Sequence, residues 1–244
     1  MKKYLLICVT YHSDKELQIF LESVDRAARF VNGKMVVDIQ IVDNGEQNRG
    51  YLKGALQIYN EKAIEYDFVS ISNVDLELAP DFFENILTVE TNGIGWIAPD
   101  IYTDKINRHE NPYMLSRPTR FNFYIWNTIY SNTFIYWFYN ILHKLKNCKQ
   151  KAYSACNIYA GHGSFMLFTK NFVIHNPTLH FPGFMYGEEI YMAEITRKTN
   201  LSVKYVPTLC IFNIGNVSTG RINQAQKSQW SKESLHAIQK LFFE

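Results

Sequence analysis

The first hundred residues alternate between short apolar runs and amphipathic stretches. The apolar runs, which are typical of buried strands, lie at 3–10, 35–42, 68–72 and 94–98. Between them, apolar residues recur at helical spacing in 17–24 and 51–65, and a further helix is expected after Pro80. This alternation predicts an α/β fold with a parallel sheet, whose ligands bind at the carboxyl ends of the strands.

The middle of the chain has a different character. Ten of the twenty residues from Phe121 to Asn140 are aromatic, and residues 122–143 include no Asp, Glu, Lys or Arg. Lysines follow at 144, 146, 149 and 151. Residues 101–155 are therefore expected to form an aromatic-rich helical insert. One interpretation is a helix at a membrane surface, with the lysines drawn to anionic lipid; the alternatives are a buried helical hairpin or a dimer contact.

The core pattern resumes after the insert. An apolar strand is expected at 164–169, a helix at 188–198 and a pair of strands around Pro207. A C-terminal helix ends in Leu241-Phe242-Phe243. With 244 residues and no linker-like segment, the chain is expected to form a single domain, 1–244.

Composition narrows the classes of function. Hydrophobic residues make up 47% of the chain, which is enough for a sizeable core, and the net charge is only +2. This balance argues against nucleic acid as a partner. The four cysteines have no CxxC spacing, and no run of about 18 apolar residues is present. These features favour a protein of the cytoplasm.

Polar residues follow the first three predicted strands. They are Thr10-Tyr11, Asp43-Asn44 and Asn73-Val74-Asp75. An aromatic ring can stack on a base, a carboxylate can accept from a base N–H, and a second carboxylate can hold a divalent cation that bridges two phosphates. Each residue alone is more often a turn or cap residue. Their shared position at one sheet edge favours a binding site.

Two later segments could complete such a site. Glu188 and Glu189 stand at a predicted helix start after Gly187, where one carboxylate could act as a general base and only one is expected to face the cleft. The alternative is that they only complement the helix dipole. Gly161-His162-Gly163-Ser164 precedes a strand, where glycine lets the backbone approach a ligand; a plain strand-entry turn is the alternative.

In chain order, these motifs resemble those of the bacterial family 2 inverting glycosyltransferases of the surface-polysaccharide, rhamnosyltransferase-like type. Ile41–Gly45 is similar to the family's "VDNGS" turn, and Ser72–Asp75 resembles the "NPDV" form of its DxD motif. Gly161–Phe168 is similar to its "GAAMLF" strand, and Phe184–Arg197 resembles its "FLYxEDxDLxxR" helix. Asn48–Tyr51 looks like its "NxGF" segment.

The resemblance implies a GT-A fold, in which a Rossmann-like, mostly parallel sheet is flanked by helices. Residues 1–100 would form the nucleotide-binding half, and residues 156–244 the acceptor-side half with the C-terminal helix. The implied nucleotide-sugar contacts are Thr10, Tyr11, Asp43, Asn44, Asn73 and Asp75. Gly163 and Ser164 would lie on the acceptor side.

The resemblance also implies the chemistry. Glu189 would be the catalytic base with Glu188 beside it, and Asp75 would ligate a divalent cation, manganese or magnesium. Asn213 stands where many relatives have a histidine ligand, before Ser218-Thr219. An amide oxygen can still ligate a hard cation, although manganese prefers imidazole to it.

The implied function is transfer of a sugar from a UDP- or dTDP-linked donor to a growing surface polysaccharide or lipid-linked glycan. The enzyme would work in the cytoplasm, and the sequence leaves open both peripheral attachment to the inner face of the plasma membrane and homo-oligomer formation. The substitution at Asn213 motivates an alternative, a degenerate relative that binds a nucleotide-sugar or a partner enzyme without catalysing transfer.

Overall fold

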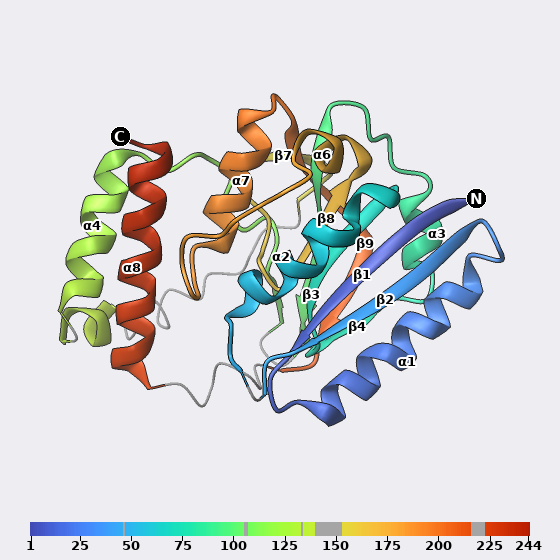
Figure 1. Ribbon diagram of the computed structural model, residues 1–244, viewed down its shortest axis with the longest axis horizontal. Coiled ribbons are helices and arrows are strands. Elements are labelled where there is room, and N and C mark those ends of the chain that lie inside the picture. The colour runs from blue at the N-terminus through green and yellow to red at the C-terminus, as the bar shows by residue number, and fades with distance from the viewer. Residues whose placement is uncertain (46, 105–106, 133, 140–152, 216–222) are drawn as a thin grey trace.

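The computed structural model describes residues 1–45, 47–104, 107–132, 134–139, 153–215 and 223–244. Within these residues, nine strands form one sheet in the order β2-β1-β3-β8-β5-β9-β4, with β6 beside β5 and β7 beside β9 (Figure 1). The strands are β1 Lys2–Thr10, β2 Met35–Asp43, β3 Phe68–Asn73, β4 Leu76–Leu78, β5 Ile94–Thr103, β6 Arg108–His109, β7 Cys156–Ile158, β8 Phe165–Thr169 and β9 Ser202–Asn213.

Helices flank the sheet. They are α1 Asp14–Phe30, α2 Tyr51–Lys62, α3 Phe82–Ile86, α4 Arg120–Ser131, α6 Lys170–His175, α7 Glu188–Lys198 and α8 Gln224–Phe242, with the 3-10 helix η1 at Ala63–Glu65. Residues 134–139 are also helical. Apart from the strand pair at Pro207, each expected strand and helix of the core has a counterpart here, with ends that differ by a few residues.

The apolar run of β1 is buried on both faces because each face has its own helical layer. Leu5 and Ile7 belong to a core with α2, α6, α7 and α8. Leu6 and Cys8 belong to a second core with α1 and α3 on the opposite face. A continuous apolar strand is what such a three-layer arrangement requires.

The sheet is mixed rather than mostly parallel. β1 runs parallel to both β2 and β3, as expected, and β5 runs parallel to β9. However, β8 lies antiparallel between β3 and β5. Its first residue, Phe165, pairs with Ser72 near the end of β3. The start of β8 therefore lies at the same sheet edge as the carboxyl ends of β1 and β3.

The expected strand pair around Pro207 is a single strand, β9. Its register with β5 jumps from Pro99 opposite Val206 to Asp100 opposite Cys210. The extra residues contain Pro207, which has no backbone N–H to give to the sheet. A bulge accommodates the proline, so the strand continues to Asn213.

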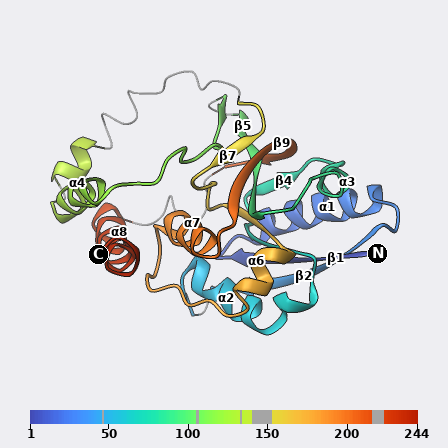
Figure 2. The ribbon, with the colours of Figure 1, turned by 90° about the horizontal axis from the view of Figure 1, so that it is seen from above.

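The expected insert at 101–155 is only partly helical. β5 continues to Thr103 and pairs with the short strand β6 before α4 begins. α4 packs against α8, where Asn127 donates to the side chain of Gln239 at 3.0 Å (Figures 1 and 2). The lysines at 144–151 lie outside the described residues.

A buried carboxylate joins the insert, α7 and the C-terminus. Glu194 is fully buried and accepts hydrogen bonds from Arg117 at 2.7 Å, Arg197 at 2.9 Å and the hydroxyl of Tyr159 at 2.9 Å. Arg117 also donates to the carbonyl of Phe242. Burial acts to raise the pKa of Glu194, but these hydrogen bonds outweigh it and hold the pKa below its ordinary value.

We predict that Glu194→Gln lowers the free energy of unfolding by about 3 kcal/mol at pH 7, because it removes the shared charge of a buried ion-pair network. A carboxylate with a lowered pKa stabilises the fold above its unfolded pKa and loses that effect as the pH falls through its folded pKa. The deficit should therefore shrink in acid. Urea unfolding from pH 7 to pH 3 measures it, with the exposed Glu61→Gln as the matched control. A deficit that is constant with pH would contradict the assignment.

Candidate functional site at the strand ends

A cleft of about 770 Å³ opens where β1 and β3 end and β8 begins. Most of the residues that the sequence singled out line it. They are Thr10, Tyr11, Asn44, Asn73, Asp75, Gly163, Ser164, Glu188, Glu189 and Asn213. The strand-end and glutamate segments are thus brought together, whereas Asp43 does not line the cleft.

The floor next to β1 contains two buried polar side chains. The carbonyl of Thr10 accepts from the backbone N–H of Asn44 at 2.9 Å, which ties the two strand ends together. Thr10 Oγ1 and Asn44 Oδ1 have no hydrogen-bond partner among the residues that the structure describes. Both atoms have almost no exposed surface, so they lie beneath the cleft wall rather than open to it, and leaving each unsatisfied costs about 1–3 kcal/mol.

Tyr11, His12 and Asp43 form the adjoining rim. The rings of Tyr11 and His12 lie 4.5 Å apart, and His12 adopts a positive φ of 50°. Asp43 is exposed, and its Oδ1 accepts from the N–H of Gly45 at 2.7 Å. Asp43 therefore takes the turn-residue conformation, beside the cleft rather than in it, and its role toward a base stays a prediction.

Asp75 and Asn213 lie together at the β4 end of the cleft. Asp75 is buried, and its carbonyl accepts from the N–H of Ile214 at 3.0 Å. Asn213 pairs with Leu76 in the sheet, and its Oδ1 accepts from the N–H of Gly215 at 3.0 Å. The Ser218-Thr219 pair that would follow lies outside the described residues.

This end of the cleft is suited to one kind of cation site. Over the described ranges, no three His, Cys, Asp or Glu side chains come together as metal ligands. The chain offers one carboxylate, Asp75, and the amide oxygens of Asn73 and Asn213. Mg²⁺ is often bound by one or two carboxylates together with substrate phosphates. The residues therefore fit a cation shared with a diphosphate better than one held by the protein alone.

The turn before α7 presents two glutamates to the cleft. Tyr186 and Gly187 have φ values of 70° and 83°, and a Cβ at Gly187 would stand 2.8 Å from Ile238 Cδ1. Both the positive φ and this contact favour glycine at position 187. Both Glu188 and Glu189 line the cleft, which corrects the expectation that only one would face it.

The two glutamates have different surroundings. Glu188 is buried and accepts from the N–H of Tyr186 at 2.9 Å. Burial, helped by the charge of Glu189, raises the pKa of Glu188 to about 8. Glu189 is only partly buried, and its Oε1 accepts from the N–H of Gly163 at 3.3 Å. At neutral pH Glu188 therefore holds a proton.

The turn before β8 faces Glu189 closely. A Cβ at Gly163 would stand 2.6 Å from Glu189 Oε1, so a side chain here would displace the carboxylate. Beside it, His162 Nδ1 lies 3.2 Å from the N–H of Ser164 and 2.8 Å from its Oγ. Because a backbone N–H can only donate, His162 Nδ1 is an acceptor and the ring proton belongs on Nε2.

Tyr51, the first residue of α2, connects this helix to the turn before β8. Its hydroxyl donates to the carbonyl of Gly163 at 2.9 Å. Burial raises the pKa of Tyr51 well above its ordinary value, and the charges of Glu188, Glu189 and Asp75 raise it further. The sequence analysis placed Tyr51 only in the segment Asn48–Tyr51 and did not assign it to the site.

Aromatic residues that the sequence analysis did not assign to the site form the remaining wall. The ring of Phe184 lies 4.8 Å from that of Trp230, which comes from α8. Tyr113 also lines the cleft, and the charge of Glu189 raises its pKa well above the ordinary value. Phe184 lies in a recognised motif, but no local pattern distinguishes Trp230 or Tyr113 from packing residues.

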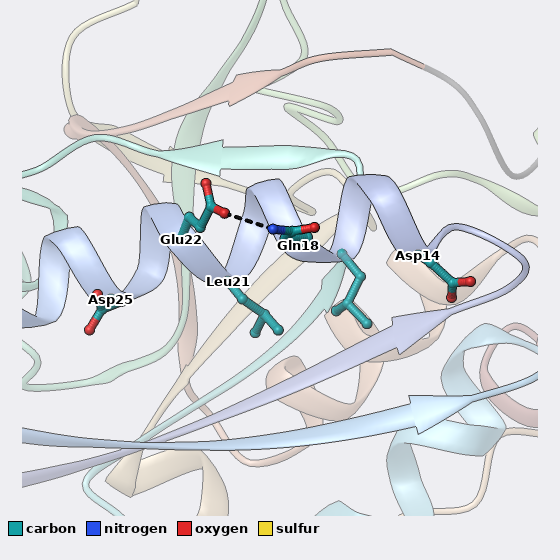
Figure 3. A pocket seen from close by; sticks show the side chains of 6 residues that line it. Asp14, Gln18, Leu21, Glu22 and Asp25 are labelled. Atoms are coloured by element: carbon teal, nitrogen blue, oxygen red, sulfur yellow. Dashed lines mark hydrogen bonds between the residues drawn. The ribbon is translucent and has the colours of Figure 1, made fainter.

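A second hollow lies on the outer side of α1 (Figure 3). One helix supplies all of its lining residues, Asp14, Leu17, Gln18, Leu21, Glu22 and Asp25. The side chain of Gln18 already donates to Glu22 at 3.1 Å. No residue from another element adds a polar group here, so the strand-end cleft is the candidate site.

No family model matches the chain, and no curated protein matches it. Solved structures do. The catalytic domain of Drosophila beta1,4galactosyltransferase 7, in a complex with xylobiose, is similar at a TM-score of 0.52 and 13% identity over 94% of this chain and 80% of that one. A mutant of that enzyme with manganese, UDP-Gal and xylobiose gives 0.53 at 13% identity over the same shares.

Other structures are similar to the same extent. A197 from STIV has a TM-score of 0.51 and 12% identity over 88% of this chain and 87% of that chain. GalNAc-T7 with UDP, GalNAc and Mn²⁺ has 0.51 and 11% identity over 98% of this chain and 48% of that one. At these identities the likeness concerns the fold. The expected fold class is confirmed: the chain has the α/β architecture of the GT-A glycosyltransferases.

Proposed function

We propose that this protein is an inverting glycosyltransferase that moves a sugar from a UDP- or dTDP-linked donor to a surface polysaccharide or lipid-linked glycan. One observation carries the proposal. A single cleft combines a polar floor suited to a nucleoside diphosphate, around Thr10, Asn44 and Asp75, with a glutamate, Glu189, on the opposite segment. Nucleotide-sugar transfer requires both parts within one cleft.

The donor would occupy the strand-end side. Thr10 and Asn44 would lie beside the nucleoside, since both residues line this end of the cleft. Tyr11 offers a ring for stacking at the rim. Asp75, with Asn213, would hold a divalent cation, which when bound neutralises charge on the leaving diphosphate.

The acceptor would lie in the cleft beside Glu189 and the turn before β8. Glu189 would take the proton of the acceptor hydroxyl while that oxygen forms a bond to the anomeric carbon. The bond from this carbon to the diphosphate oxygen breaks on the opposite face, so the configuration inverts. Because Glu188 is protonated at neutral pH, Glu189 is the better base. The N–H of Gly163 orients its carboxylate.

A second candidate function is binding without transfer. Asn213 supplies only an amide, and its Oδ1 already accepts from Gly215. A cation would then be held weakly, and the protein would bind a nucleotide-sugar or a partner enzyme. Hydrolysis of a UDP-sugar in the presence of manganese distinguishes the two, since a protein that only binds would release no UDP.

We predict that Glu189→Gln lowers UDP release from a bound UDP-sugar by about a hundredfold or more, the usual scale of general-base catalysis. The UDP-sugar used in this assay is the member of a panel of UDP-sugars that most raises the melting temperature of the protein. Glutamine keeps the acceptor for the N–H of Gly163 but cannot take a proton, so donor affinity should change little. Glu188→Gln is the control and should cost less. Full activity in both variants would show that the pair only caps α7, and loss of activity in Glu188→Gln alone would make Glu188 the base.

Glu188→Gln should also change how stability depends on pH. Because its pKa is raised to about 8, folded Glu188 keeps a proton that the unfolded chain loses above its ordinary value near 4.5. This carboxyl therefore lowers stability progressively from about pH 5 to pH 8. The melting temperature of Glu188→Gln should rise relative to wild type over that window. A difference in melting temperature that stays constant with pH would show that the pKa of Glu188 is not raised.

Asp75→Asn should weaken manganese-dependent binding of UDP or dTDP about tenfold or more, which is roughly 1.4 kcal/mol. Calorimetric titration with and without manganese measures it. Manganese alone should bind weakly to both proteins, since the remaining ligands would come from the diphosphate. Equal manganese-dependent binding by the folded variant would remove Asp75 from the donor site.

A further inference from the structure

Large apolar side chains are exposed on both helical stretches of the insert. The residues that we call the outer aromatic face are Phe121, Tyr124, Ile125, Phe134, Ile135, Trp137 and Phe138. They come from α4 and from the helical residues 134–139. The most exposed, Phe134, is 74% exposed. Single exposed apolar residues are common on soluble proteins, but such a cluster marks an interaction surface.

The opposite side of the same helices is packed. Phe123 is fully buried, its ring lying 4.4 Å from that of Phe243. Trp126 packs against the core, and the rings of Tyr130 and Tyr136 lie 5.4 Å apart. The helices are therefore held in place by their inner side. The outer aromatic face is a feature of the folded chain rather than a core side left open.

Charge indicates what covers the face. No Asp or Glu occurs in the sequence from Asn111 to Gly187, a stretch that contains the whole face. Arg120 begins α4, and Lys144, Lys146, Lys149 and Lys151 follow the face in the sequence; of the other basic residues in the stretch, Arg117 is paired with Glu194 and Lys170 belongs to α6. A segment that is aromatic and basic but never acidic complements an anionic lipid surface.

Other occupants fit less well. None of the helices formed by the described residues combines the length and the hydropathy needed to cross a bilayer, so the contact would be with the membrane surface. In a dimer formed through this face, two copies of the same basic segment, neither with an acidic residue, would lie against each other. The repulsion between their like charges costs free energy. Trp, Tyr and Phe are also the side chains favoured at the headgroup level.

We propose that the outer aromatic face docks the protein on an anionic membrane surface, with Phe134 and Trp137 entering the boundary between headgroups and acyl chains. This attachment does not depend on the proposed transferase activity. α4 also packs against α8, which supplies Trp230 to the cleft wall. The helices that would contact lipid are thus connected to one side of the cleft.

Flotation with vesicles tests the proposal. Wild type should float with phosphatidylglycerol–phosphatidylcholine vesicles, and less with phosphatidylcholine alone or in high salt. Phe134→Ser with Trp137→Ser should lower the partition coefficient about tenfold or more, since each removes a side chain that lipid would bury. The matched control is Phe30→Ser with Ile174→Ser, because these two side chains are each 53% exposed outside the face. The control should float like wild type.

Two measurements keep the test decisive. Circular dichroism establishes that the variants are folded, and UDP binding with manganese, which involves no residue of the face, should be unchanged. Loss of flotation with UDP binding retained supports the proposal even if transfer is never detected. Wild-type protein that stays out of both vesicle types overturns it. So does a wild-type dimer, seen by light scattering, that the double variant makes monomeric while flotation is unaffected.

Discussion

The antiparallel pairing of β8 with β3 is the constraint on which the site depends. It places the start of β8 at the edge where β1 and β3 end, and the N–H of Asn73 donates to the carbonyl of Ser164 at 2.8 Å. Without this pairing, the turn at 161–164 would have no reason to lie beside Asp75. With it, Gly163 reaches Glu189, and Tyr51 bonds the turn from the other side. Donor-side and acceptor-side residues therefore share one cleft.

Local pattern was enough for much of the fold. β1 to β3 are continuous apolar strands, and the polar residues that follow them have a fixed place once the strands are parallel. The joint position of Thr10, Asn44 and Asp75 could thus be predicted. The glutamates could be predicted as well, because Gly187 marks the start of α7. These signals all come from residues near one another in the sequence.

The remainder depends on pairings between distant segments. An apolar run such as 164–169 does not encode its neighbours or its direction, so the mixed sheet could not be deduced from it. Trp230 reaches the cleft only because α8 packs on α4 and α7. Asp43 shows that a local motif can also fit two roles at once. An aspartate before Asn-Gly satisfies both a turn and a binding motif, and here its oxygen accepts the N–H of Gly45.

The dependence of the cleft on α8 has a consequence for how the site comes into being during synthesis. The sheet and most of its helical layers use residues up to Asn213. Trp230 comes from α8, as does Ser234, whose hydroxyl donates to the carbonyl of Met185. Domains begin to fold as the chain emerges from the ribosome. A nascent chain that has released β9 but not α8 can pair its strands, yet one wall of the cleft is missing. Completion of the cleft is thus tied to release of the C-terminal helix, well after the strand ends that form its floor have come together.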